Sequence, residues 1–291
     1  MDEQKTGKSP VARNALVAGD AAKDDSGLSE AEQEKIDDQA PLRSPALFAS
    51  ISQAGDEEMR RPSGSLFWSG LAAGVAIFAS VIAEGALHEK LPEMVGREAI
   101  ADLGYSVGFL IVILGRMQLF TEQTVVPVLS VARRPTRSNL ARLGRLWAIV
   151  FGANMIGAFA VAGVAAAGGL AAPPLQQAMV EISMSLLGKS PGDVLLQGIP
   201  AGFLIASIAW LLASTKSDHF ALVLVITYVI ALGGFSHVVA GAAEAFLLAW
   251  SGEATFVWAV RDFILPALAG NIIGGTGLFA LFAYAQVRRE L

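Results

Sequence analysis

The sequence predicts an all-α membrane protein with six transmembrane helices, and three observations carry that prediction. Of its 291 residues, 54% are apolar and only 16% are charged, whereas soluble domains carry about a quarter charged residues. Residues 1–62 hold 13 acidic and 8 basic side chains, so nearly half of all charge lies in this first segment. The remainder contains long apolar stretches of the roughly 20 residues that a helix needs to cross a bilayer core.

The chain divides into an acidic N-terminal tail, residues 1–62, and a six-span domain, residues 63–291. The first ten residues lack the basic start and apolar run of a cleavable signal peptide. Ser29-Glu-Ala-Glu32 is a capping-box pattern that predicts a short helix to about Asp38. Residues 45–60 place apolar side chains on one side of a second helix, which we expect at the membrane surface. A solvated tail with only transient helix is the alternative.

Four stretches are apolar and long enough for one crossing each, with a single charge, Glu84, among them. They are Ser65–Leu87, Leu146–Ala172, Val194–Thr215 and Phe263–Ala285. Small-residue pairs four apart occur in several spans, Gly70 with Gly74 being one, and such pairs favour close helix packing.

Two further stretches, Leu103–Ala132 and Phe220–Trp250, are apolar but contain polar residues, charges and helix breakers. Each would measure about 45 Å as one helix at 1.5 Å per residue, which exceeds a single crossing. The sequence therefore predicts that the second and fifth spans are broken near the middle of the membrane. Broken helices are tolerated there only where protein or a water-filled cavity satisfies the freed backbone groups.

Positive charge predicts the orientation of the spans. Ten lysines and arginines lie in the tails and even-numbered connections, whereas four lie in the odd-numbered connections. We therefore expect both termini on the cytoplasmic side. Three spans per half also invert the second half relative to the first, and paired interruptions in inverted halves indicate a binding site at the midplane.

The residues at the breaks resemble the formate/nitrite transporter family. The matching segments are GRMQLFTEQT at 115–124, GFSHVVAGAAEAF at 234–246 and GNIIGG at 270–275. The resemblance spans about residues 62–287. It implies an aquaporin-like six-helix fold and a homopentamer in a bacterial cytoplasmic (inner) membrane. It also implies one pore per protomer for small monovalent weak-acid anions such as formate or nitrite, with membrane lipid around it.

Seven residues form the predicted substrate pathway under this resemblance. His237 is similar to the family's central histidine, Thr121 to the hydroxyl that faces it, Leu119 and Phe120 to its apolar constriction, and Asn271 to its sixth-span polar residue; Phe235 and Ser236 complete the second break.

The sequence departs from the family pattern at three places. Ser236 replaces a glutamate before the histidine, and Gly241 replaces an asparagine four residues after it. The family's conserved lysine falls near Leu186, while Lys189 lies in a different frame. These departures, together with Arg116, Gln118 and Glu122, resemble the marks of a divergent branch of the family.

The intramembrane charges suggest two mechanisms. His237 either donates a proton to the anion while Thr121 holds the ring, or it is a neutral histidine with a structural role. Arg116 and Glu122 flank the first break and are predicted to brace it as a pair; alternatively, Arg116 attracts anions. In the second mechanism the anion crosses without a proton, and the dipoles of the half-helices together with Arg116 stabilise its charge.

Two other functions compete with transport. The acidic tail suggests a membrane scaffold or sensor, and Gly104-Tyr-Ser-Val-Gly108 matches the G-x-S-x-G pattern of a serine hydrolase. The hydrolase motif precedes a long apolar helix rather than a strand-to-helix turn, so an enzyme is not predicted. Zero cysteines and three scattered histidines predict no metal site. No cofactor and no nucleic-acid partner are predicted.

Overall fold

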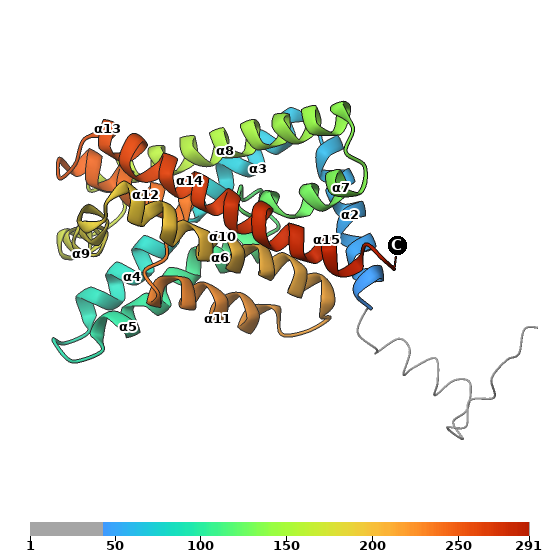
Figure 1. Cartoon of the computed structure of the whole chain (residues 1–291). Helices are drawn as coiled ribbons and strands as arrows, with labels where there is room; N and C mark the ends of the chain where they lie inside the picture. The colour runs from blue at the N-terminus through green and yellow to red at the C-terminus, as the bar shows by residue number, and fades with distance from the viewer. Residues whose placement is uncertain (1–42, 291) are drawn as a thin grey trace, which may run out of the picture. The chain divides into compact units, whose positions relative to one another are not determined.

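The computed structural model describes residues 43–290, and every regular element within them is a helix (Figure 1). The predicted helix from Ser29 to Asp38 lies outside the described residues. The all-α prediction is confirmed for the part of the chain that the structure covers.

Four helical runs are long and apolar enough to cross a membrane. They are Ser63–Lys90, Arg137–Ala166, Pro191–Ser214 and Phe256–Val287. Each coincides with one of the four uninterrupted stretches predicted from the sequence. The first comprises α3 (Ser63–Ala76) and α4 (Ala79–Lys90), the second is α8, the third is α10, and the last comprises α13 (Phe256–Trp258), η4 (Ala259–Ile264), α14 (Leu265–Ile272), η5 (Ile273–Ala280) and α15 (Leu281–Val287).

Local sequence explains where these helices begin and end. The Ser190 and Asp193 side chains form a reciprocal capping box at the start of α10, which Pro191 opens. The predicted third span continues to Ala172, but α8 ends at Ala166. Gly168 follows with a φ of 76°, a conformation that glycine adopts readily and that terminates helices.

The other two apolar stretches are each divided into two helices. In the first, α6 (Ser106–Leu114) and α7 (Val126–Arg133) are separated by residues 115–125, which contain only the short 3₁₀ helix η2 (Glu122–Thr124). In the second, α11 (His219–Leu232) and α12 (Val238–Ser251) are separated by residues 233–237. Each of the four helices is shorter than the roughly 20 residues of a full crossing. We call residues 115–125 and 233–237 the first and second interruptions.

The helix α2 (Ser44–Arg60) packs against α7 and α15 rather than extending away from the bundle. Its predicted apolar side, Leu47, Phe48 and Ile51, is buried in a cluster with α7 residues. Gln286 Nε2 donates to Ser44 Oγ at 3.1 Å, so the two ends of the described chain meet (Figure 1). The predicted tail boundary at residue 62 stays a prediction, but α2 belongs to the helical unit.

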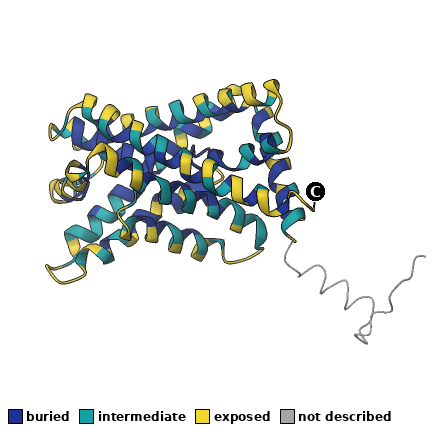
Figure 2. Cartoon of the chain, viewed as in Figure 1, coloured by how far each residue is buried: buried dark blue, intermediate teal, exposed yellow. Residues whose placement is uncertain are grey.

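The opposite end of the bundle is formed by short helices (Figure 1). These are α5 (Arg97–Ala101), η1 (Asp102–Tyr105), α9 (Pro173–Ser183) and η3 (Met184–Gly188). In Figure 2 the buried residues lie where the helices face one another, and the exposed residues lie at the periphery and the ends. The exposed residues include many large apolar side chains, Trp68, Val225 and Leu281 among them, and such an exterior suits a lipid environment.

Close helix contacts bring α3 against α8 and α10 against α14. A Cβ atom on Gly74 would collide with the carbonyl oxygen of Asn154, and one on Gly202 would collide with that of Asn271. Glycine is required at both positions because the backbones touch. These two contacts place an asparagine beside each interruption.

Candidate functional site

Asn154 of α8 holds the first interruption in place. Its Nδ2 donates to the carbonyl oxygens of Gly70 at 2.7 Å and Gln118 at 2.9 Å, and its Oδ1 accepts from the Phe120 N–H at 2.9 Å. The side chain is fully buried. One amide therefore satisfies three backbone groups, two of which the interrupted helix has freed.

Asn271 of α14 does the same for the second interruption. Its Nδ2 donates to the carbonyl oxygens of Gly198 at 2.9 Å and Ser236 at 2.8 Å, and its Oδ1 accepts from the Val238 N–H at 2.9 Å. The predicted polar residue of the sixth span thus lies beside the second break. The two asparagines make matching sets of bonds in the two halves of the chain.

The helices before the two interruptions end in the same way. Arg116 has a φ of 52° and Gly234 has a φ of 61°, each two residues after its helix ends. The next residues, Met117 and Phe235, each donate to a carbonyl oxygen five residues back. This is a helix ending that favours glycine at the left-handed position. Arg116 adopts it at a steric cost that Gly234 avoids.

His237 and Thr121 meet between the interruptions. The distance from His237 Nε2 to Thr121 Oγ1 is 2.7 Å, and both residues are buried, at 1% and 0% exposure. The Phe109 ring lies edge-on to the imidazole at a centroid distance of 4.9 Å. The two residues that the sequence pairs therefore lie in direct contact.

The hydrogen bonds of His237 assign its tautomer. Its Nδ1 accepts from the Ala240 N–H at 3.2 Å, so the imidazole caps the first turn of α12. An accepting Nδ1 carries no proton, so in the neutral ring Nε2 carries it and donates to Thr121. The Thr121 hydroxyl then keeps its own proton available for another acceptor.

Leu119 and Phe120 are buried, at 0% and 2% exposure. The Phe120 ring packs edge-on against Phe151 at 5.0 Å and Trp147 at 5.7 Å. With Thr121 they line neither of the two cavities described next, although Gln118 and Glu122 on either side of them in the chain line the second.

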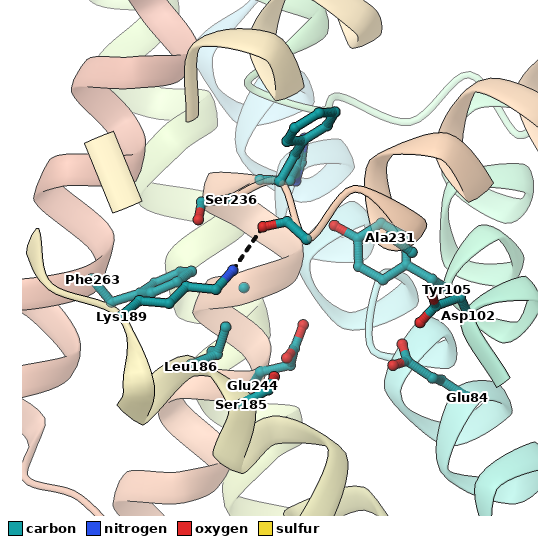
Figure 3. A pocket seen from close by; sticks show the side chains of 14 residues that line it. Glu84, Asp102, Tyr105, Ser185, Leu186, Lys189, Ala231, Ser236, Glu244 and Phe263 are labelled. Carbon is teal, nitrogen blue, oxygen red and sulfur yellow. Dashed lines mark hydrogen bonds between the residues drawn. The ribbon is translucent and has the colours of Figure 1, made fainter. Parts of the chain in front are cut away.

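The first cavity, of about 110 Å³, is called the Lys189 cavity. It is lined by Glu84, Asp102, Tyr105, Ser185, Leu186, Lys189, Ala231, Gly234, Phe235, Ser236, His237, Gly241, Glu244 and Phe263. Lys189 Nζ donates to the Gly234 carbonyl oxygen at 2.8 Å (Figure 3). Burial lowers the pKa of Lys189, while Glu244 and Asp193 act in the opposite direction. In Figure 3 Lys189 and Glu84 lie on opposite sides of the view, with Glu244 between them.

The second cavity, of about 570 Å³, is called the Arg116 cavity. It is lined by Ser50, Ile51, Ala54, Glu58, Arg61, Ile113, Leu114, Arg116, Met117, Gln118, Glu122, Gln123, Val126, Ala209, Leu212, Ala213 and His219. The Lys189 cavity is lined by residues of α4 and η3, and the Arg116 cavity is lined by residues of α2 and α7. These two sets of helices lie towards opposite ends of the bundle (Figure 1). Arg116 and Glu122 both line this cavity, and within residues 43–290 no ion pair of 4.0 Å or less joins them.

The hydrolase alternative is wrong, because the serine of its motif does not lie at an exposed strand-to-helix turn. Ser106 is the first residue of α6, is fully buried, and donates its hydroxyl to the Leu224 carbonyl oxygen at 3.2 Å. Gly104 and Gly108 touch the α4 side of the bundle, which explains both glycines by packing. Within the described part of the chain, no group of three His, Asp or Glu residues is placed to hold a metal ion.

Sequence reasoning named Lys189 without assigning it to the site, and it missed Asn154. Lys189 follows the 3₁₀ helix η3 directly and lines the first cavity. Asn154 gave a weaker signal, a single amide in an otherwise apolar span. Its equivalence to Asn271 becomes visible only from the shared bonding pattern.

Comparison with known proteins agrees with this geometry. A family profile described as "Formate/nitrite transporter" matches residues 45–285. The "Inner membrane protein YfdC" of Escherichia coli (strain K12) is 36% identical over 258 residues, which is 88% of this chain and 82% of that protein.

Two solved structures share the fold. One is an "FNT family ion channel", with a TM-score of 0.72 at 17% identity, covering 82% of this chain and 98% of the other. The second is a "Pentameric formate channel with formate bound", with a TM-score of 0.65 at 19% identity, covering 78% and 98%. The extent of the profile match and the identity to the bacterial relative show that the chain belongs to the formate/nitrite transporter family.

Proposed function

We propose that this chain is a transmembrane channel or transporter for small monovalent weak-acid anions such as formate or nitrite. The observation that carries the proposal is the buried contact of His237 with Thr121, 2.7 Å apart, where the two interruptions meet. The related pentameric formate channel supports formate as a test substrate and a homopentamer as the assembly.

The proposed topology has six spans in two inverted halves, with the second and fifth spans broken. The matching bonds of Asn154 and Asn271 support two equivalent halves. The meeting of Ser44 with Gln286 supports an even number of crossings. The positive charge in the tails and even connections, and the inner-membrane location of YfdC, support termini in the bacterial cytoplasm.

The proposed pathway runs from the Lys189 cavity, past His237 and Thr121, to the Arg116 cavity. Leu119 and Phe120 form its apolar constriction, and Phe235 and Ser236 border it in the Lys189 cavity. An anion in such a constriction loses hydration, for which the idealised cost at low dielectric is of order 20 kcal/mol. Protonation of the anion removes most of this cost, so the acid crosses in neutral form.

His237 can supply this proton only if the ring replaces it. Its Nε2 proton passes through the Thr121 hydroxyl to the anion, while Nδ1 takes up a proton from the Lys189 cavity, which is lined in part by His237. Protonation of Nδ1 breaks the bond from the Ala240 N–H. The relay therefore costs one helix cap, about 1 kcal/mol.

The test is formate flux into proteoliposomes across a pH gradient. His237→Asn keeps an acceptor for Ala240 and a donor for Thr121 but cannot carry an extra proton, so we expect the pH dependence of flux to flatten. Thr121→Ala removes the hydroxyl and should lower flux about tenfold, the effect of losing roughly 1.4 kcal/mol of interaction.

His88→Asn is the matched control, because His88 lines neither cavity. It should transport as the wild type does. An unchanged pH profile in His237→Asn would eliminate the proton relay. Absence of formate and nitrite flux in the wild type would contradict the proposed function itself and favour the scaffold or sensor role of the acidic tail.

A further inference from the structure

The Arg116 cavity contains two buried glutamines without partners. Gln118 and Gln123 are 4% and 3% exposed, and the side-chain oxygen of each makes no hydrogen bond with any described residue. No bond from either amide nitrogen to residues 43–290 is found. A buried carboxamide without a partner is unfavourable. Because neither the oxygen nor the nitrogen of these amides has a hydrogen-bond partner, rotation of the amide can turn its oxygen towards the cavity. A donor on a ligand would then hydrogen-bond to that oxygen.

Gln118 is also next to the constriction. Leu119 follows it directly, and the Gln118 backbone is fixed at both ends, by Ser69 Oγ at its N–H and by Asn154 at its carbonyl. Gln118 is therefore a polar residue that lines the Arg116 cavity and directly precedes the constriction residues in the chain. A neutral acid that has crossed the constriction carries one hydrogen-bond donor, its O–H group, which matches the unpartnered oxygen.

The cavity also contains a carboxylate that can take the proton of the acid and a cation that can pair with the resulting anion. Glu58 is paired with Arg61 at 3.1 Å, so these two charges offset each other. Arg116 and Glu122 make no ion pair with a described residue. One carboxylate and one guanidinium thus face the cavity without close partners.

From this arrangement we propose that the Arg116 cavity is where the weak acid exchanges its proton. Gln118 accepts a hydrogen bond from the acid O–H, Glu122 takes the proton, and Arg116 pairs with the anion that remains. The acid O–H bond breaks and a carboxyl O–H bond forms on Glu122, which then releases the proton to water in the cavity. The same steps in reverse protonate an anion that enters from this side.

The surroundings of Glu122 are defined. The charged and titratable groups around it are Glu58 and Arg61 from α2, Arg116 from its own segment and His219 from the start of α11. The α10 residues that complete the cavity, Ala209, Leu212 and Ala213, are apolar. His219 is bonded through Nε2 to the Thr215 carbonyl oxygen at 3.0 Å, which leaves Glu122 as the carboxylate of this cavity that makes no ion pair with a described residue.

This inference rests on the proposed function, and the two fail differently. Formate flux is measured in proteoliposomes while pH is varied only on the side that the Arg116 cavity faces. In Glu122→Gln we expect the flux to lose its dependence on that pH, whereas Glu122→Asp restores it. Glu57→Gln is the matched control, because Glu57 is exposed on α2 and lines neither cavity.

A second variant removes the acceptor instead of the carboxylate. Gln118→Met keeps the size of the side chain, so the KM for formate from this side should rise about tenfold while the pH dependence remains. A wild-type pH profile in folded Glu122→Gln overturns the proposal, as does an unchanged KM in Gln118→Met. If Glu122→Gln does not assemble, Gln118→Met alone decides. Loss of formate flux from the wild-type chain would instead refute the proposed function.

Discussion

Arg116 occupies the same backbone position in the first interruption that Gly234 occupies in the second. Both have positive φ, and only glycine adopts that conformation without a steric penalty. The guanidinium is exposed in the Arg116 cavity and makes no ion pair with a described residue. No ion pair of the guanidinium with a described residue offsets the backbone strain at Arg116. Strained residues of this kind are typical of binding sites.

Arg116→Gly separates these two roles. Relief of the backbone strain should stabilise the folded protein by about 1 kcal/mol and raise its thermal midpoint in detergent. Loss of the guanidinium should lower formate flux about tenfold, equivalent to about 1.4 kcal/mol. Arg142→Gly is the control, because Arg142 is exposed within α8. Glycine inside a helix should lower the stability of the folded protein by about 0.5–1 kcal/mol and leave the flux unchanged. A less stable Arg116→Gly protein with normal flux would indicate that Arg116 is a structural brace.

At the scale of elements, each interruption depends on an asparagine from a neighbouring continuous helix. The equivalent positions are Asn154 in α8 and Asn271 in α14, and each makes three hydrogen bonds to backbone groups. Because these groups are buried, each costs about 1–3 kcal/mol if it loses its partner. The two amides therefore bond backbone groups at the interruptions that have no helical partner.

Asn154→Ala and Asn271→Ala should therefore each destabilise the protein by about 3 kcal/mol or more, measured by thermal unfolding in detergent. Asn139→Ala is the control. Asn139 is half-buried near the start of α8, and its side chain makes one hydrogen bond, to the Arg134 carbonyl oxygen, so its loss should change stability by less than about 0.5 kcal/mol. Wild-type stability in either buried variant would show that water satisfies the freed groups.

The sequence predicted the residues that are unusual for an apolar span, but it did not predict contacts that depend on the three-dimensional packing. His237 could be singled out because an ionisable residue in a long apolar stretch is costly, whereas Thr121 was identified through the resemblance of the first break to the family. Lys189 could not be assigned to a cavity, because its bond to the Gly234 carbonyl oxygen joins residues that are 45 positions apart in the chain. Nor could the sequence show that α2 turns its apolar side to α7, since a membrane surface would satisfy the same amphipathic pattern.

At the scale of the whole molecule, the two cavities differ in size and in their unpaired charges. The Lys189 cavity has three carboxylates and one lysine among its lining residues, whereas the acidic and basic residues of the Arg116 cavity balance. Both border the segment that contains Thr121 or His237. The proposed passage joins the two cavities end to end through these residues.

The passage can be tested directly because the chain contains no cysteine. Ser185 lines the Lys189 cavity and Ser50 lines the Arg116 cavity, and both are exposed. Ser185→Cys and Ser50→Cys each exchange one atom and provide a single site for a membrane-impermeant anionic thiol reagent.

The decisive measurement is formate flux before and after this reagent is added to one side of the proteoliposome membrane. The account predicts that the two variants react from opposite sides and that each loses most of its flux when labelled. Labelling of both from the same side, or labelled protein that transports formate at the unlabelled rate, would contradict a single passage through the two cavities.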